Sequence, residues 1–135
     1  TESILIQSID QAAQVLGKLR QAGIHVALDD FGVGYSSLNY LSNLPVDILK
    51  IDRSLTKQIL TDQKQLALLK SIVEMARIND LMVVAEGVET QAEQAIITSA
   101  GVQYIQGYYY ARPMPGEKLT EFLKQGPVIH SETPQ

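Results

Sequence analysis

The chain contains no cysteine and only two histidines among its 135 residues. Without cysteine there are no disulfide bonds, thiolate metal sites or cysteine nucleophiles, which fits a reducing compartment. The histidines, His25 and His130, lie far in sequence from the acidic residues discussed below, and we interpret both as structural or surface residues. The sequence therefore argues against a metal site built on sulfur or imidazole.

Long apolar runs and clusters of basic residues are absent as well. No apolar run approaches the roughly 20 residues that span a bilayer, and no signal peptide is visible. The net charge of −4, without a cluster of lysine or arginine, argues against DNA as a partner but leaves open a small phosphorylated ligand held by a metal. A hydrophobic fraction of 45% suits the core of one small domain. We therefore expect a cytoplasmic protein with no membrane segment in this chain.

Short apolar segments, each ending on polar side chains, are the main positive feature. They are residues 24–28 before Asp29 and Asp30, 47–51 with Lys50 and Asp52, 81–85 before Glu86 and Glu89, and 104–105 before Gln106. Helical patterns separate these segments, and strands that alternate with helices predict an α/β fold with a parallel sheet. Ligand sites of such folds collect at the carboxyl ends of the strands. We therefore expect the polar groups to converge on one site.

The neighbouring carboxylates of Asp29 and Asp30 favour a divalent cation, because such groups repel each other unless a proton or a metal ion separates their charges. A solvated turn is the alternative, since aspartate is common where strands end in turns. Lys50 and Asp52 lie on one face of their strand because side chains alternate, so both are predicted to reach the same site. The amide of Gln106 offers a polar ligand both a donor and an acceptor.

The helical spacing of apolar residues predicts helices over residues 9–22, 38–41, 65–78, 91–100 and 117–125. Gly23 is placed to end the first helix, and Thr90 with Glu93 forms a capping-box pattern at the start of the fourth. Pro115 precedes the last helix. We expect residues 1–125 to form the folded part and residues 126–135 a flexible tail.

Four strings occur in the order DDFGVGYSSL, ILKIDRSL, VVAEGVET and QGYYYARPMP, and together they resemble the C-terminal motifs of the EAL domain family. The resemblance extends over about residues 1–125. It implies a (β/α)8 barrel of the TIM type, modified by an antiparallel strand, of which four βα units would form about half here. It further implies a bacterial enzyme that hydrolyses cyclic di-GMP to pGpG with two Mg²⁺ or Mn²⁺ ions.

The resemblance also implies metal ligands. Asp29 corresponds to the carboxylate that bridges both ions, and Asp30 to a ligand of the second ion, supported by Glu86. Glu86 has a competing assignment as the base. Val33 stands where the family usually has threonine, which affects the anchoring of the loop more than the chemistry.

The remaining assignments concern the substrate and the loop. Lys50 would hold the attacking water and offset charge on the phosphoryl oxygens, and Asp52 would orient the cluster. Glu89 resembles the acid that tethers the loop over residues 32–35, and Gln106 a ligand or base-contacting amide near the substrate.

Several family residues have no counterpart in this chain. The Glu-Ala-Leu string, the arginine after it, and a glutamate and an asparagine that bind the first ion are missing. We therefore expect a fragment of a longer protein, inactive by itself. Open sheet edges, one of them at residues 24–29, predict self-association. We expect a homodimer that either pairs half-barrels or packs through the loop over residues 31–37; the resemblance implies the second arrangement, because the family also uses this loop in dimerisation.

Three alternatives to a phosphodiesterase fit the residues to different degrees. A phospho-receiver domain is disfavoured because Lys50 and Asp52 share one strand and Glu86 would have no role. A Schiff-base aldolase using Lys50 is disfavoured because the surrounding acids raise the pKa of the lysine. A non-catalytic EAL-like module that binds cyclic di-GMP or a protein partner stays open.

Overall fold

The computed structural model describes residues 2–32, 41 and 44–126, with the backbone alone for residues 2–7. In this part of the chain the strands form one parallel sheet in the order β1-β2-β3-β4. The strands are β1 (Ala27–Phe31), β2 (Ile48–Ile51), β3 (Met82–Ala85) and β4 (Tyr104–Ile105). The helices are α1 (Glu2–Gln21), α3 (Arg53–Gln58), α4 (Gln63–Ile78), α5 (Gln91–Ser99) and α6 (Gly116–Lys124). The predicted parallel α/β architecture is confirmed.

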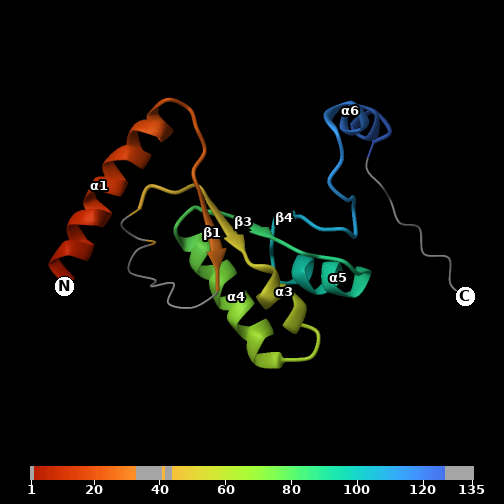
Figure 1. Cartoon of the computed structure of the whole chain (residues 1–135). Coiled ribbons are helices and arrows are strands. Elements are labelled where there is room, and N and C mark those ends of the chain that lie inside the picture. The colour runs from red at the N-terminus through yellow and green to blue at the C-terminus, as the bar shows by residue number, and fades with distance from the viewer. Residues whose placement is uncertain (1, 33–40, 42–43, 127–135) are drawn as a thin grey trace, which may run out of the picture.

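The hydrophobic core lies between the sheet and the helices that follow β2 and β3. Figure 1 shows α3, α4 and α5 grouped on one side of the sheet, whereas α1 and α6 stand apart at its two ends. Alternate residues of β2 and β3 face this core and are fully buried: Leu49, Ile51, Val83 and Ala85. The residues between them are only half-buried. The sheet therefore has one covered face and one face that remains partly open.

Local sequence explains where most helices begin and end. Thr90 accepts a hydrogen bond from the N–H of Glu93, and the Glu93 carboxylate accepts one from the N–H of Thr90, which confirms the capping box. Asp62 caps α4 in a similar way through the N–H of Lys64. Gly23, with φ of +82°, follows the end of α1 as predicted.

Two elements differ from the prediction. Helix α1 begins at Glu2 instead of residue 9, because residues 2–8 contain no glycine or proline that would break it. Helix α3 was not predicted, since six residues are too few to show a helical period. The predicted helix over 38–41 lies outside the described residues except for Leu41, and the predicted tail does so except for Gly126. None of the helices in the described part is both long and apolar enough to cross a membrane.

Candidate active site

A β-bulge places the acidic pair at the end of β1. Leu28 pairs with Leu49 of β2 and Phe31 pairs with Ile51, so one strand advances three residues while the other advances two. Asp30, inside this irregularity, has a φ of +55°, a conformation that aspartate tolerates better than most residues. Bulges of this kind change the direction of side chains beside active sites. The irregularity thus gives the acids a placement that simple alternation along a strand would not give.

Lys50 of β2 joins the ends of three neighbouring strands. Its Nζ lies 3.2 Å from Oδ2 of Asp29 and 2.5 Å from Oε1 of Glu86, the residue after β3. Glu86 and, less strongly, Asp29 raise the pKa of Lys50. The N–H of Asp30, 2.8 Å from Oδ1 of Asp29, and then Lys50 lower the pKa of Asp29. The side-chain nitrogen of Lys50 therefore lies between the carboxylate groups of Asp29 and Glu86.

Part of a cation site is present at this edge of the sheet. Asp29 and Asp30 offer carboxylate oxygens, and the Asp29 side chain is 57% exposed. Within the described residues, however, no group of three acidic or histidine side chains is arranged to hold a metal ion. Mg²⁺ requires about six oxygen ligands. These two aspartates fit a divalent cation as a partial donor set that other oxygens would have to complete.

Asp52 occupies a different place from the one its strand alternation suggested. Its Oδ1 accepts a hydrogen bond of 2.7 Å from the N–H of Ser54, so it caps the N-terminus of α3. Hydrogen bonds from the side chain and the backbone of Ser54 lower the pKa of Asp52. Its charge also acts weakly on Asp29, raising the pKa of that carboxyl. Asp52 lies near the site and fixes the start of the helix that follows Lys50.

Glu89 binds two cations of α3. Its carboxylate oxygens lie 2.9 Å from Nη2 of Arg53 and 2.8 Å from Nζ of Lys57, and Lys57 is the main cause of the lowered pKa of Glu89. Lys57 also lies 3.5 Å from Oε1 of Glu93. Arg53 and Lys57 were not predicted from the sequence; their spacing of four residues would have pointed to one helix face had α3 been predicted. The predicted tether of Glu89 to the loop over 32–35 falls largely on residues that are not described.

Gln106 joins β4 to the loop after β3. Its N–H donates to the carbonyl of Ala85 over 2.8 Å, and its own carbonyl accepts from the N–H of Val88 over 3.3 Å. Gly107 lies so close to Val88 that a Cβ there would overlap the Val88 backbone. A cavity of about 200 Å³ brings Gln106 together with Arg53, Glu86, Gly87, Glu89, Gly107 and Tyr108. The structure thus places Gln106 and both glutamates around one hollow.

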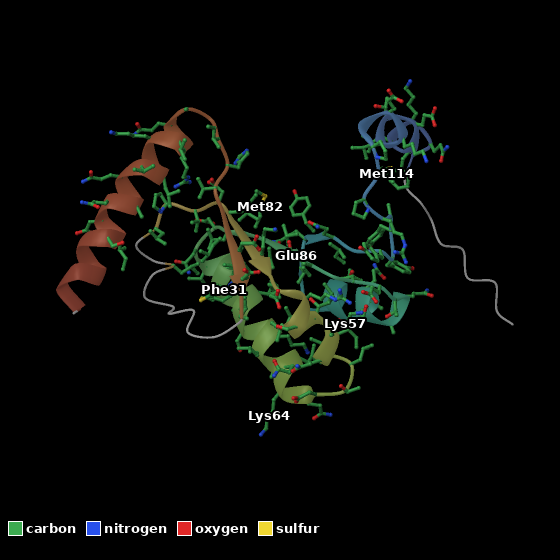
Figure 2. All side chains as sticks on the ribbon, viewed as in Figure 1. Phe31, Lys57, Lys64, Met82, Glu86 and Met114 are labelled. Carbon is green, nitrogen blue, oxygen red and sulfur yellow. The ribbon has the colours of Figure 1, made fainter. Side chains whose placement is uncertain are left out.

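A second cavity, of about 320 Å³, is also lined by Gln106. It extends from Tyr108 to Met114, which is labelled in Figure 2, and on to Phe122 of α6. Two of the lining residues form a cation–π contact, in which the guanidinium carbon of Arg112 lies 4.5 Å from the centre of the Tyr108 ring.

Comparisons with known proteins identify the family to which this chain belongs. The sequence model of the EAL domain matches residues 1–113. The chain belongs to the EAL domain family. The chain covers the C-terminal part of this TIM-barrel-type domain.

Curated and solved EAL proteins are similar over most of this chain. The cyclic di-GMP phosphodiesterase NbdA of Pseudomonas aeruginosa is 44% identical over 124 residues, which are 92% of this chain and 16% of NbdA. The EAL domain of Mycobacterium smegmatis DcpA superposes with a TM-score of 0.85 and 36% identity, over 95% of this chain and 57% of that chain. The PaMucR phosphodiesterase in complex with c-di-GMP gives a TM-score of 0.76 and 43% identity, over 82% of this chain and 44% of that chain.

Metal complexes occur among these EAL structures. BlrP1 of Klebsiella pneumoniae is known as a complex with calcium and c-di-GMP, with a TM-score of 0.74 and 38% identity over 81% of this chain and 28% of that chain. It is also known as a complex with manganese and c-di-GMP. The present chain spans 16 to 20% of the length of the curated relatives it matches.

Proposed function

We propose that the protein carrying this EAL chain is a cytoplasmic bacterial phosphodiesterase that hydrolyses cyclic di-GMP to pGpG. The observation that supports this proposal most directly is the position of Lys50 between Asp29 and Glu86, at the carboxyl ends of three adjacent strands. The similarity to NbdA and to the c-di-GMP complex of PaMucR supports the choice of substrate.

Each residue of the site has a chemical task in this proposal. Asp29 and Asp30, with Glu86 nearby, would hold Mg²⁺ or Mn²⁺, two ions in the intact domain. Such ions lower the pKa of a bound water and stabilise charge on phosphoryl oxygens. The ammonium of Lys50 orients that water and offsets negative charge as it develops. Gln106, which lines the cavity that it shares with Glu86 and Glu89, would contact the substrate.

Neighbouring residues keep these groups in place. Asp52, two residues beyond Lys50, caps the N-terminus of α3. Glu89 holds the loop that begins at Glu86 through its ion pairs with α3.

The test of the metal assignment is Asp29→Asn in the protein with its whole EAL domain. We expect Mg²⁺-dependent cleavage of c-di-GMP to fall by about 10²-fold or more, because a neutral amide neither bridges two cations nor supports hydroxide formation. Asp10→Asn, at an exposed position of α1 outside the site, is the matched control and should retain full activity. Near-normal turnover of Asp29→Asn would contradict the two-metal proposal.

We further propose that the 135-residue chain alone does not hydrolyse c-di-GMP, even at millimolar Mg²⁺ or Mn²⁺. The absence of a group of three metal ligands among the described residues supports this expectation. A second copy would supply the same half of the site and could not complete it. Formation of pGpG by the purified chain, followed by chromatography, would show that the missing ligands are dispensable.

The alternative is a non-catalytic module that binds c-di-GMP or a protein partner. One observation favours it: within the described residues, no group of three acidic or histidine side chains is arranged to hold a metal ion, as a two-metal catalytic site would require. Turnover with Mg²⁺ and nucleotide affinity in the presence of a chelator separate the two functions. Tight binding with chelator present and no turnover of the intact domain would favour the module.

A further inference from the structure

Four charged side chains join α3 to the loop that follows β3. They are Arg53 and Lys57 of α3 and Glu89 and Glu93 of the loop and α5, and we call them the α3 clamp. Lys57 is central, because its ammonium lies 2.8 Å from Glu89 and 3.5 Å from Glu93. Figure 2 shows Lys57 where α3 and α5 approach each other.

Glu93 is the buried member of the clamp. Its side chain is only 5% exposed. Oε2 accepts hydrogen bonds from the N–H of Glu89, at 2.7 Å, and from the N–H of Thr90, at 3.1 Å. Removing a carboxylate from water is costly unless a counter-charge and hydrogen bonds compensate. Lys57 is the cation that faces Glu93, and it thereby permits Glu93 to hold the backbone of the loop.

The loop fixed in this way begins at Glu86. The N–H of Glu86 donates to the carbonyl of Ile51 over 3.1 Å, which ties the loop to the end of β2. At Gly87, where φ is +71°, the aliphatic stem of Arg53 packs so closely that a Cβ would overlap it. Glu86 is therefore tied to β2, the strand that carries Lys50, and the next residue, Gly87, packs against Arg53 of α3.

We propose that Lys57 is a positioning residue: by binding Glu89 and buried Glu93 it fixes the loop over residues 86–90, and so holds Glu86 against Lys50. This role goes beyond the surface pairing that an exposed lysine makes with an acid, because one of its two partners is buried and hydrogen-bonded to the loop backbone. Its consequence for turnover rests on the proposed phosphodiesterase function. Its consequence for the loop does not.

The experiment compares Lys57→Met, Lys57→Arg and the control Lys70→Met, which removes an exposed lysine of α4 away from the clamp. Amide hydrogen exchange of the chain should become about tenfold faster at Glu86, Glu89 and Thr90 in Lys57→Met, as loss of one charge-assisted interaction predicts. Amides of α4 should keep their rates. Lys57→Arg should restore slow exchange, and Lys70→Met should resemble the wild type.

Steady-state kinetics of the protein with its whole EAL domain form the second part of the test. Lys57→Met should lower kcat with little change in KM, because Lys57 does not contact the cavity around Gln106. Equal acceleration of exchange in the loop and in α4 would show general destabilisation and overturn the proposal. Unchanged loop exchange, or a loosened loop with normal kcat, would overturn it too. If the wild-type domain lacks phosphodiesterase activity, the proposed function fails while the exchange data still decide whether Lys57 fixes the loop.

Discussion

Gly107→Ala tests whether the close approach of β4 to the loop after β3 holds the site together. A methyl group at this position would overlap the backbone nitrogen, carbon and oxygen of Val88, which is fully buried. Backbone atoms cannot turn away as a flexible side chain can. The end of β4 and the loop must therefore separate.

The size of the effect follows from the contacts that separate. Two backbone hydrogen bonds cross this junction: Val88 N–H to Gln106 carbonyl, 3.3 Å, and Tyr109 N–H to Val88 carbonyl, 3.0 Å. Each contributes about 1 kcal/mol, and overpacking a buried site costs about 1–3 kcal/mol. We expect the free energy of unfolding to fall by about 3–5 kcal/mol in Gly107→Ala, if both hydrogen bonds are lost. The same separation moves Gln106 away from the cavity that it shares with Glu86 and Glu89.

Equilibrium unfolding in urea measures this change, and the chain supplies a matched control. Gly17 lies inside α1, and a Cβ added to it would meet no atom within 4 Å, so Gly17→Ala adds the same methyl group without overlap. Alanine favours a helix interior over glycine by about 0.5–1 kcal/mol, so this variant should be slightly more stable than the wild type. If Gly107→Ala unfolds at the wild-type urea concentration, the close packing of Gly107 against Val88 is not what stabilises this part of the sheet.

Three further predictions concern the site, acid stability and assembly. Lys50→Met in the intact domain should lower kcat by about 10²-fold with a small change in KM, since its charge acts mainly as negative charge develops; a pure rise in KM would contradict this role. Hydrogen bonds and nearby cations lower the pKa values of Asp52, Glu89 and Glu93, although burial acts in the opposite direction, most strongly in Glu93. These carboxyl groups therefore bind protons more weakly in the folded chain than in the unfolded chain. Their contribution to stability is fully present above the ordinary pKa values of 3.8 for aspartate and 4.5 for glutamate, and it is lost as the pH falls below these values. The urea concentration at the midpoint of unfolding should therefore drop between pH 6 and pH 3. An unchanged or higher midpoint at pH 3 would refute the ion-pair assignment. In the described part of the chain no further strand pairs with the outer edges of β1 and β4, which predicts self-association as a homodimer; a single monomeric species in sedimentation at micromolar concentration would argue against it.

The structure brings most of the predicted site residues together at one edge of the sheet but places Asp52 at the start of α3. It brings Asp29, Lys50 and Glu86 into direct contact, as expected for strand ends that meet at one edge. Gln106 lines a cavity together with Glu86 and Glu89. Asp52 instead turns to the N-terminus of α3, because the strand ends at Ile51 and alternation no longer applies beyond it.

Residues of α3 show why part of the site could not be predicted. Arg53 and Lys57 lie 36 residues before Glu89 and Glu93 respectively, and no local pattern links the two segments. Their ion pairs exist because β2 and β3 are neighbours with a fixed register, which brings the elements after each strand together. A shift of the register by one residue would turn the strand side chains to the opposite face and break these contacts.

The sequence by itself determined the alternation of strands and helices, the capping box of α5 and the motifs of the EAL family, because burial periodicity and helix capping depend on residues a few positions apart. Tertiary structure decided the bulge that positions Asp29 and Asp30, the place of Lys50 between two carboxylates and the contact of Gly107 with Val88. These features depend on which strands pair and in which register. Such pairing is set by the free energy of the whole core and cannot be inferred from any one segment.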